Sequence, residues 1–187
     1  MEKLLLHCCC GPCSTASVEQ LISLGYEITL FFGNSNIFPA EEADRRYEAL
    51  ERVAHHFGLP CIRTMQRHQQ WLEAIKGLEA EPEGHRRCEK CFEWNLAEAK
   101  EIATTLGIDK FTTTLTISPH KRSATIFSVG QSQEGFVALD FKKKGGFYRS
   151  IELSEVLNLY RQSYCGCEFS MSRLLKKQQA DGHDTHS

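Results

Sequence analysis

Nine cysteines are the residues in this chain whose type and spacing could do chemistry. Eight of them fall in three short groups, and Cys61 stands alone: the groups are Cys8, Cys9, Cys10 and Cys13, then Cys88 and Cys91, then Cys165 and Cys167. Thiolates bind zinc and iron–sulfur clusters and also exchange with disulfides. An odd number of cysteines in tight clusters favours metal ligation or redox catalysis over a disulfide framework.

Two of these groups lie where helices are expected to begin. The first follows a short aliphatic strand, Lys3 to His7, and precedes a predicted helix over Thr15 to Leu24 that Ser14 can cap. Ligands bind at such strand ends in open α/β sheets, and a helix N-terminus favours the thiolate. The second group is a C-x2-C pair at the start of another predicted helix. The six cysteines of these two groups can supply the four thiolates of a metal site, and ligand type alone leaves zinc and an iron–sulfur cluster equally open.

The third group, Cys165-Gly-Cys167, has a different geometry. A glycine between two cysteines permits a tight turn and a strained disulfide, which is the labile, catalytic kind. The same pair could bind a second metal, or it could be two small buried hydrophobic side chains. Cys61 lies in a short apolar segment, where core packing is the favoured interpretation.

Apolar segments and turn residues predict alternating strands and helices, which imply an α/β fold with a parallel sheet. The predicted strands are Lys3–His7, Glu27–Phe32, Cys61–Met65 and Lys110–Thr114, and the predicted helices are Thr15–Leu24, Ala40–Phe57, Gln69–Leu78, Cys88–Leu106, Ser123–Ser128 and Ser154–Tyr164. After Pro119 the composition changes, and residues 130–146 are rich in glycine and basic side chains, which predicts a small C-terminal lobe. We expect one domain over residues 1–174 and a polar tail over 175–187, disordered from Gln178 onward.

Composition narrows the functional classes. The chain has 187 residues, 41% of them hydrophobic, and a net charge of −2. It is therefore no uniformly basic protein that coats nucleic acid, and any polyanion must meet a local patch. No run of 18 apolar residues and no secretory leader is evident, so we expect a cytoplasmic protein with no membrane partner.

Three local patches carry positive charge: Arg86 with Arg87, His120 to Arg122 around Lys121, and Lys142 to Arg149. They could contact the phosphates of an RNA stem-loop, with Phe147, Tyr148 or Tyr164 stacking an exposed base. Each could also be an ordinary solvated turn or a core aromatic.

Polar residues at the ends of the first two predicted strands are further candidates. Asn34 and Asn36, followed by Arg45 and Arg46, could contact the ribose or phosphate of a substrate, or they could be loop caps and helix-surface charges. His7 could hydrogen-bond a thiolate or deliver a proton, or it could face the core.

Six blocks of sequence resemble, in order and up to about Ser172, the QueH family of epoxyqueuosine reductases. The blocks are LLLHCCCGPCST, NSNIFPAEEADRRYEAL, EGHRRCEKCFEWNLAEA, TTTLTISPHK, DFKKKGGFYRS and YRQSYCGCEFS. The resemblance implies a Rossmann-like three-layer domain, similar to adenine nucleotide alpha-hydrolase and PP-loop proteins. Cysteines stand where the latter carry a pyrophosphate loop, which argues against ATP chemistry. It also implies a cytoplasmic enzyme that reduces the epoxide of epoxyqueuosine, at the wobble position of tRNA, to queuosine.

The same resemblance implies a ligand set. Cys9 and Cys10 match the family's cysteine doublet and, with Cys88 and Cys91, would hold a 4Fe-4S cluster; a register using Cys8 and Cys9 is the alternative. Cys165 and Cys167 match the family's CGC, implying either a redox-active disulfide or, with Cys13, a second, mononuclear iron site. Candidate substrate contacts are Asn34, Asn36, Arg86, Arg87, Lys121 and Tyr164. The expected partners are the tRNA and an unidentified electron donor.

Two other classes of function compete with this one. A zinc-stabilised RNA-binding module would use Cys9, Cys10, Cys88 and Cys91 for structure alone, and a thiol-disulfide protein would use only the CGC pair. An epoxide becomes an alkene by taking up two electrons and two protons and losing water, and a single cluster normally passes one electron at a time. A second redox element beside the cluster would solve this counting problem for a reductase, whereas the other two classes pose no such problem.

Overall fold

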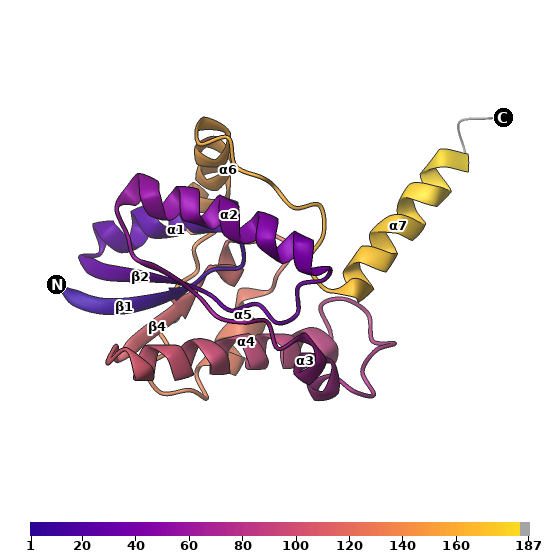
Figure 1. Ribbon diagram of the computed structural model, residues 1–187, viewed down its shortest axis with the longest axis horizontal. Helices are drawn as coiled ribbons and strands as arrows, with labels where there is room; N and C mark the ends of the chain where they lie inside the picture. Colours follow the sequence, from indigo (N-terminus) through magenta and orange to yellow (C-terminus); the bar gives the residue numbers. More distant parts are fainter. Residues whose placement is uncertain (184–187) are drawn as a thin grey trace.

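A four-stranded, all-parallel sheet lies at the centre of the computed structural model, which describes residues 1–183 (Figure 1). The strands are β1 (Glu2–His7), β2 (Tyr26–Phe32), β3 (Cys61–Arg63) and β4 (Lys110–Thr113). They lie in the order β3-β2-β1-β4. The order reverses between β1 and β4, and in doubly wound sheets this switch point is where ligands bind.

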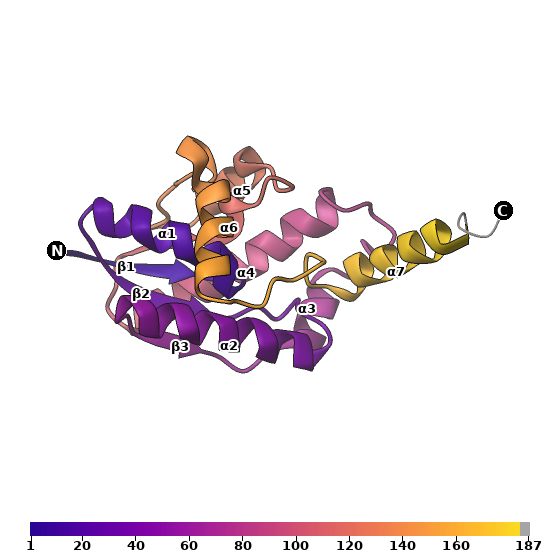
Figure 2. The same cartoon turned by 90° about the horizontal axis from the view of Figure 1, so that it is seen from above.

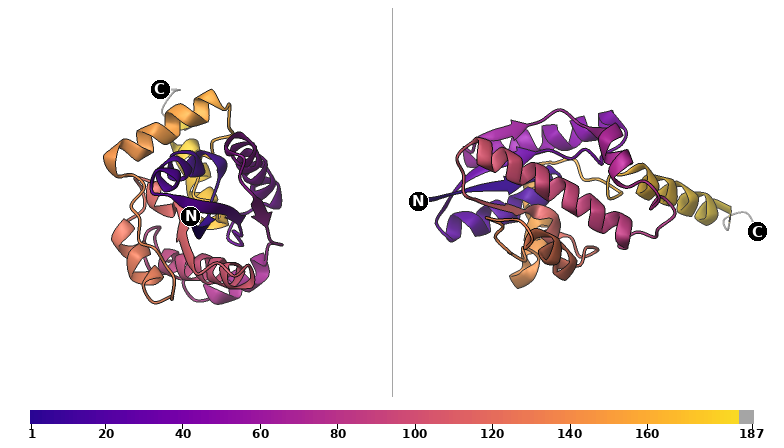
Figure 3. Two further views of the ribbon diagram at one scale, coloured as in Figure 1. Left: turned by 90° about the vertical axis from the view of Figure 1, so that its left-hand side faces the viewer. Right: turned by 90° about the horizontal axis from the view of Figure 1, so that it is seen from below.

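Helices cover both faces of the sheet, which makes the Rossmann-like three-layer arrangement expected from the sequence (Figures 1 and 3). They are α1 (Gly11–Ser23), α2 (Ala40–Phe57), α3 (His68–Ala74), α4 (Arg86–Thr105), α5 (Ser123–Gly130), α6 (Gly146–Val156) and α7 (Glu168–His183), with short 3-10 helices η1 (Thr114–Ile117) and η2 (Lys143–Gly145). Helices α1 and α2 pack on one face and α4 on the other, while α6 packs against α1 and α5 against α4. Helices α5 and α6, which follow the last strand, thus pack on opposite layers.

Alternation along β1 divides the core between the two layers. Leu4 and Leu6 are buried in a cluster with residues of α1 and α2, whereas Leu5, between them, is buried in a cluster with residues of α4. Successive side chains of a strand point to opposite faces, so one aliphatic run anchors both helical layers.

Helix α1 begins earlier than the sequence predicts, and this correction matters for the cysteines. The predicted start was Thr15 with Ser14 as cap, but the helix begins at Gly11, and Cys10 is its N-cap. Its sulfur accepts a hydrogen bond from the backbone N–H of Cys13, and Pro12 suits the first helical turn. The cysteine segment therefore forms the helix N-terminus itself.

One helix predicted near the C-terminus was wrong. The helix predicted over Ser154–Tyr164 is replaced by α6, which ends at Val156 before Asn158 adopts a left-handed conformation. The division into a domain over 1–174 and a tail over 175–187 stays a prediction: α7 runs to His183, and 184–187 lie outside the described residues. Helix α7 projects away from the rest of the molecule at the end opposite the N-terminus (Figures 1 and 2). Within residues 1–183, no helix is both long and apolar enough to cross a membrane.

Gly11 allows α1 and α2 to approach closely. A Cβ built at Gly11 would lie 2.6 Å from the backbone carbon and oxygen of Ala49 in α2. We expect Gly11→Ala to lower the free energy of unfolding by about 1–3 kcal/mol, the usual cost of overpacking, although alanine is the better helix former. Urea unfolding measures this change. Ser23→Ala, at the exposed end of α1, is the matched control, and stabilisation by Gly11→Ala would contradict the close approach.

Candidate functional site

The carboxyl ends of three strands meet beside one cavity. His7, the last residue of β1, pairs with Phe31 of β2 and with Thr113 of β4, so the segments that follow these strands emerge at one edge of the sheet. The cavity there has a volume of about 470 Å³. Its lining includes Cys9, Cys13, Asn34, Asn36, Cys91, Lys121, Tyr164 and Cys165. All eight are residues that the sequence analysis named as candidates, and the structure brings them to one cavity.

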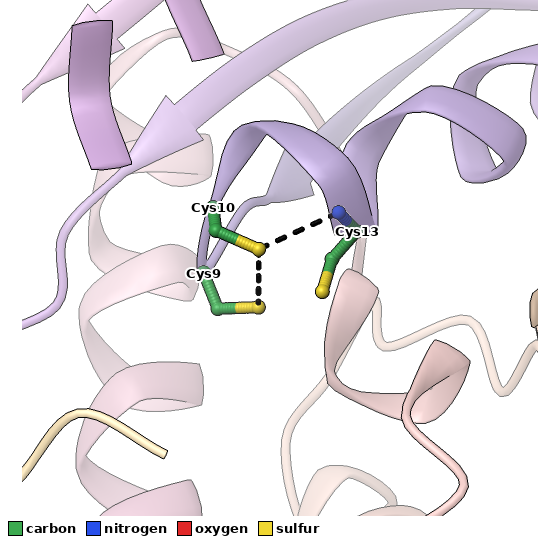
Figure 4. Close-up of side chains that lie close together, drawn as sticks. All are labelled: Cys9, Cys10 and Cys13. Carbon is green, nitrogen blue, oxygen red and sulfur yellow. Dashed lines mark hydrogen bonds between the residues drawn. The ribbon is translucent and has the colours of Figure 1, made fainter. Parts of the chain in front are cut away.

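The first thiol group lies at the N-terminus of α1 (Figure 4). The sulfurs of Cys9, Cys10 and Cys13 all lie within 4.8 Å of one another, and those of Cys9 and Cys10 are 3.9 Å apart. Gln162 donates from Nε2 to the Cys10 sulfur at 3.1 Å, which ties the loop before α7 to this group. These three residues could hold a metal ion.

Hydrogen bonding makes the three thiols unequal. Hydrogen bonds from Cys10 and Cys13 hold the pKa of Cys9 well below its ordinary value, against burial, and Lys121 contributes in the same direction. Burial raises the pKa of Cys10 to about 12. Cys9 is therefore the thiol of this group that ionises most readily, and thiolate is the form that binds metals.

Four further cysteines, Cys88, Cys91, Cys165 and Cys167, come from two segments that are far apart in the sequence, and we call them the second thiol group. Cys88 and Cys91, in the first turns of α4, interact electrostatically with Cys165 and Cys167. Burial, and then the neighbouring Cys165, Cys167 and Cys88, raise the pKa of Cys91 well above its ordinary value. All nine cysteines are free thiols, so no disulfide joins Cys165 to Cys167 in this structure.

The two groups are neighbours across the cavity. Cys9 and Cys88 pack against the same small hydrophobic cluster, formed by Phe92, Leu115 and Ile126. Lys121 interacts with Cys165, Cys9 and Cys13; although burial opposes its charge, these sulfurs raise its pKa above the ordinary value. Lys121 is therefore a persistent ammonium between the two groups.

Cys8 and Cys61 lie apart from this arrangement. Cys8 is fully buried in the core between the sheet and α1, and its sulfur donates to the carbonyl of Leu6. Cys61, on β3, packs against the same core cluster. Cys8 is not among the three grouped sulfurs, so the geometry favours Cys9 and Cys10 over Cys8 as the doublet.

The end of β1 is fixed by a buried hydrogen-bond network. Asn34 donates from Nδ2 to the carbonyl of Cys8 at 2.8 Å, and its Oδ1 lies 3.2 Å from His7 Nε2. The other ring nitrogen of His7 is 2.9 Å from the Thr113 hydroxyl. Both ring nitrogens thus have core partners, and burial lowers the pKa of His7, which keeps the ring neutral. His7 and Asn34 hold the backbone that carries the first thiol group.

A second buried network holds the C-terminal cysteine loop. Arg46 is 1% exposed, and it pairs with Glu42 at 2.7 Å, while Tyr160 donates its hydroxyl to the other oxygen of that carboxylate. The same guanidinium donates to the carbonyls of Cys165, at 2.9 Å, and Tyr164, at 3.0 Å. We call Glu42, Arg46 and Tyr160 the Arg46 network. It connects α2 to the loop that carries the CGC pair.

Gly166 makes the CGC turn possible. Its φ of 143° is a conformation that side chains disfavour, and a Cβ there would lie 3.2 Å from Arg46 Nη1. Its carbonyl accepts a hydrogen bond from the backbone N–H of Phe38, in the segment that follows β2. The glycine therefore brings two cysteines close to the Arg46 network.

Of the remaining residues predicted to contact the substrate, one lines the cavity and two lie at the start of α4. Tyr164 lines the cavity and donates its hydroxyl to the carbonyl of Phe38. Arg86 is largely exposed and pairs with Glu81. Arg87 is buried, and its guanidinium donates to the carbonyls of Glu79 and Glu81, so its contacts serve the loop before α4.

Several residues of the site were missed by the sequence analysis. Asn95, Gln162 and Arg161 also line the cavity, as does Arg46, and the partners of Arg46 in the network, Glu42 and Tyr160, were not named from the sequence. Their partners are distant in sequence, so no local pattern distinguishes them. The spacing of Glu42 and Arg46, four residues apart on a helix, was the available signal for that pair.

The spacing of the first thiol group fits two thiolates bound to one metal ion. Tetrahedral coordination with metal–sulfur bonds of about 2.3 Å separates ligand sulfurs by about 3.8 Å. The Cys9 and Cys10 sulfurs, 3.9 Å apart, match that spacing. Of the four thiols of the second group, those of Cys91 and Cys165 line the same cavity, with Cys88 and Cys167 as electrostatic neighbours of Cys91, and Lys121 adds positive charge next to the sulfurs.

Fold and site together define a class: a Rossmann-like α/β protein with a cysteine-rich, metal-binding site at the switch point of its sheet. The family model described as epoxyqueuosine reductase QueH matches residues 4–173. The chain therefore belongs to the QueH family.

Relatives named epoxyqueuosine reductase QueH support this assignment. The protein from Streptococcus pyogenes serotype M1 is 39% identical over 179 residues, which cover 90% of this chain and 70% of that protein. The protein from Haemophilus influenzae is 38% identical over 176 residues, 91% of this chain and 72% of its own length. The protein from Thermotoga maritima is 33% identical over 179 residues, which cover 91% of each chain.

Replacing Arg46 tests whether the Arg46 network holds the CGC loop in place. We expect Arg46→Met to lower the free energy of unfolding by about 3–5 kcal/mol, because Glu42 would stay buried without its ion pair. Amide hydrogen exchange in a peptide covering residues 160–167 should accelerate, because two carbonyls lose their donors. Arg52→Met, an exposed change on the same helix, is the control. Unchanged exchange in the Arg46 variant would show that the loop is held by other contacts.

Proposed function

We propose that this protein is an oxidoreductase that reduces the epoxide of epoxyqueuosine in tRNA to the alkene of queuosine. The observation that carries the proposal is that two groups of thiols, seven cysteines in all, lie next to one another in a chain of the QueH family, and that Cys9, Cys13, Cys91 and Cys165 of these groups line one cavity. The relatives bear the name of this activity.

We assign Cys9, Cys10, Cys88 and Cys91 as ligands of a 4Fe-4S cluster, and Cys13, Cys165 and Cys167 as a second redox or iron site. When bound, the cluster would supply electrons one at a time. The packing of Cys9 and Cys88 on one hydrophobic cluster supports the first set. The interaction of Lys121 with both Cys13 and Cys165 supports the closeness of the residues in the second.

The remaining chemistry falls to the side chains of the cavity. Conversion of an epoxide to an alkene takes up two electrons and two protons, and the oxygen leaves as water. The Lys121 ammonium is a positive group beside the thiols, where negative charge develops on the departing oxygen, and such preorganised charge lowers the barrier. The aromatic and aliphatic side chains in the lining, including Phe92, Leu115 and Phe147, exclude water from the reacting groups.

The charge of the cavity favours a polyanionic substrate. Although the whole chain has a net charge of −2, the lining holds five cationic side chains and one carboxylate. These are Arg46, Lys121, Arg161, Arg173 and Lys177, with Glu83. A local concentration of positive charge suits the phosphates of an RNA stem-loop.

One face of α7 extends this charge to the mouth of the cavity. Ser170, Arg173, Leu174 and Lys177 all line it, and their spacing of three and four residues places them on one side of the helix. Arg173 pairs with Glu83, and Glu168 accepts from His68, so the base of α7 is fixed to the segments around α3. Lys177 is the exposed cation of this face farthest along the helix.

Lys177 and its neighbour Lys176 give a matched pair for testing the RNA contact. We expect Lys177→Gln to weaken binding of the tRNA anticodon stem-loop, because an ammonium that faces phosphate is lost. The slope of log affinity against log salt should become shallower by about 0.7–0.9. Lys176→Gln removes the same charge outside the cavity lining and should leave the slope close to that of the wild type. Fluorescence anisotropy at several salt concentrations measures both, and equal slopes would contradict the role of α7.

Serine variants test the redox centre. Cys91→Ser should lower the iron and acid-labile sulfide content of protein purified without oxygen and abolish reduction, because a thiolate ligand is lost. Cys61→Ser, whose sulfur lies outside the cavity, should leave both unchanged. Cys165→Ser and Cys167→Ser should abolish turnover but leave the visible absorption of the cluster largely intact. Stoichiometric zinc without sulfide would instead support a structural zinc site in an RNA-binding module.

A further inference from the structure

Asn95 is a buried polar residue of the cavity for which the proposed mechanism has no use. It lies one turn after Cys91 on α4, is 2% exposed, and lines the cavity. Its Nδ2 donates to Oδ1 of Asn36 at 3.1 Å and contacts the sulfur of Cys91 at 3.8 Å. The side chain therefore connects the loop after β2 to the second thiol group.

The oxygen of the same amide has no partner. Within residues 1–183, no hydrogen-bond donor reaches Asn95 Oδ1, which is buried. With Asn36 oriented as in this structure, turning the Asn95 amide over would set oxygen against oxygen, so the hydrogen bond to Asn36 favours the orientation described. An unpaired buried acceptor costs free energy, and such groups in native proteins are usually paired.

The position of this oxygen distinguishes it from other unpaired atoms. Five further buried side-chain atoms lack a partner in the described part of the chain, in Trp71, Trp94, Glu98, Asp140 and Glu168. None of those residues lines the cavity, whereas Asn95 does. An acceptor held at the cavity wall by a neighbouring amide is suited to a ligand that brings an O–H or N–H group.

We propose that Asn95 Oδ1 accepts a hydrogen bond from the epoxide-bearing side chain of the substrate, and so selects the modified nucleoside over unmodified guanosine. This inference rests on the proposed function. The contact of Asn95 Nδ2 with Cys91 places the free oxygen within the width of one amide group of a candidate metal ligand. In the proposed reaction, the part of the substrate that lies next to Cys91 is the epoxide-bearing side chain, which is the part that is reduced.

Binding to two RNA stem-loops tests the proposal without depending on turnover. One carries epoxyqueuosine and the other guanosine at the wobble position, so they differ only in the modified base. We expect the wild-type holoprotein to bind the epoxyqueuosine loop more tightly, and Asn95→Leu to reduce this preference by about tenfold or more. Affinity for the guanosine loop should stay unchanged, because the phosphate contacts are intact.

Two controls separate substrate recognition from a structural role. Asn95→Asp keeps an acceptor at the same position and should retain more of the preference than the leucine variant. Glu89→Gln changes an exposed residue of the same helix and should match the wild type. Iron content and circular dichroism, unchanged in all three variants, would show that the site is intact.

The outcomes for the two proposals are distinguishable. Equal affinity of the wild type for both loops, or an undiminished preference in Asn95→Leu, would overturn the role of Asn95 and leave the reductase proposal standing. Failure of the wild-type protein to reduce the epoxyqueuosine loop would overturn the proposed function, whatever the affinities.

Discussion

The buried ion pair between Arg46 and Glu42 is the interaction on which the site depends. Parallel strands bring their own carboxyl ends to one edge of the sheet, and together with the hydrogen bonds of His7 and Asn34 this places the first thiol group and the loop after β2. The CGC loop has no such placement, because it belongs to an irregular segment between α6 and α7. A guanidinium held rigidly by a carboxylate donates to two of its carbonyls and fixes the loop against α2.

The thiols of the site lie close together and are largely buried, so most of them resist ionisation to the thiolate. Burial and neighbouring sulfurs raise the pKa of Cys91 and Cys10, so these groups resist ionisation. Lys121 and the three-thiol hydrogen-bond network favour one thiolate, at Cys9. Metal binding requires thiolates and releases their protons, so a bound cation would relieve the repulsion among the others. The repulsion among the thiolates of such a site falls most when a highly charged metal centre binds.

Local sequence signals predicted the sheet, the layers and the edge at which the cysteines meet. The aliphatic run at Leu4–Leu6 and the glycines after predicted helices sufficed for that, because strand and helix periods are local properties. Those signals left Arg46 as either a substrate contact or a helix-surface charge. Its contacts with the CGC loop were beyond them, because the carbonyls belong to residues 118 and 119 positions away. Asn95 gave no signal either, since its partner Asn36 lies 59 positions away. The early start of α1 was missed because a cysteine, Cys10, takes the capping position that serine usually fills.

The central claim is that seven thiols from three segments form one redox site for an epoxide in RNA. The most direct measurement is the mass of the wobble nucleoside after an epoxyqueuosine stem-loop is incubated, without oxygen, with the iron-loaded protein and a chemical reductant. The account predicts that the nucleoside loses the mass of one oxygen atom, in an amount that grows with the protein added. An unchanged nucleoside, from protein that carries its full iron and sulfide and binds the RNA, would contradict it.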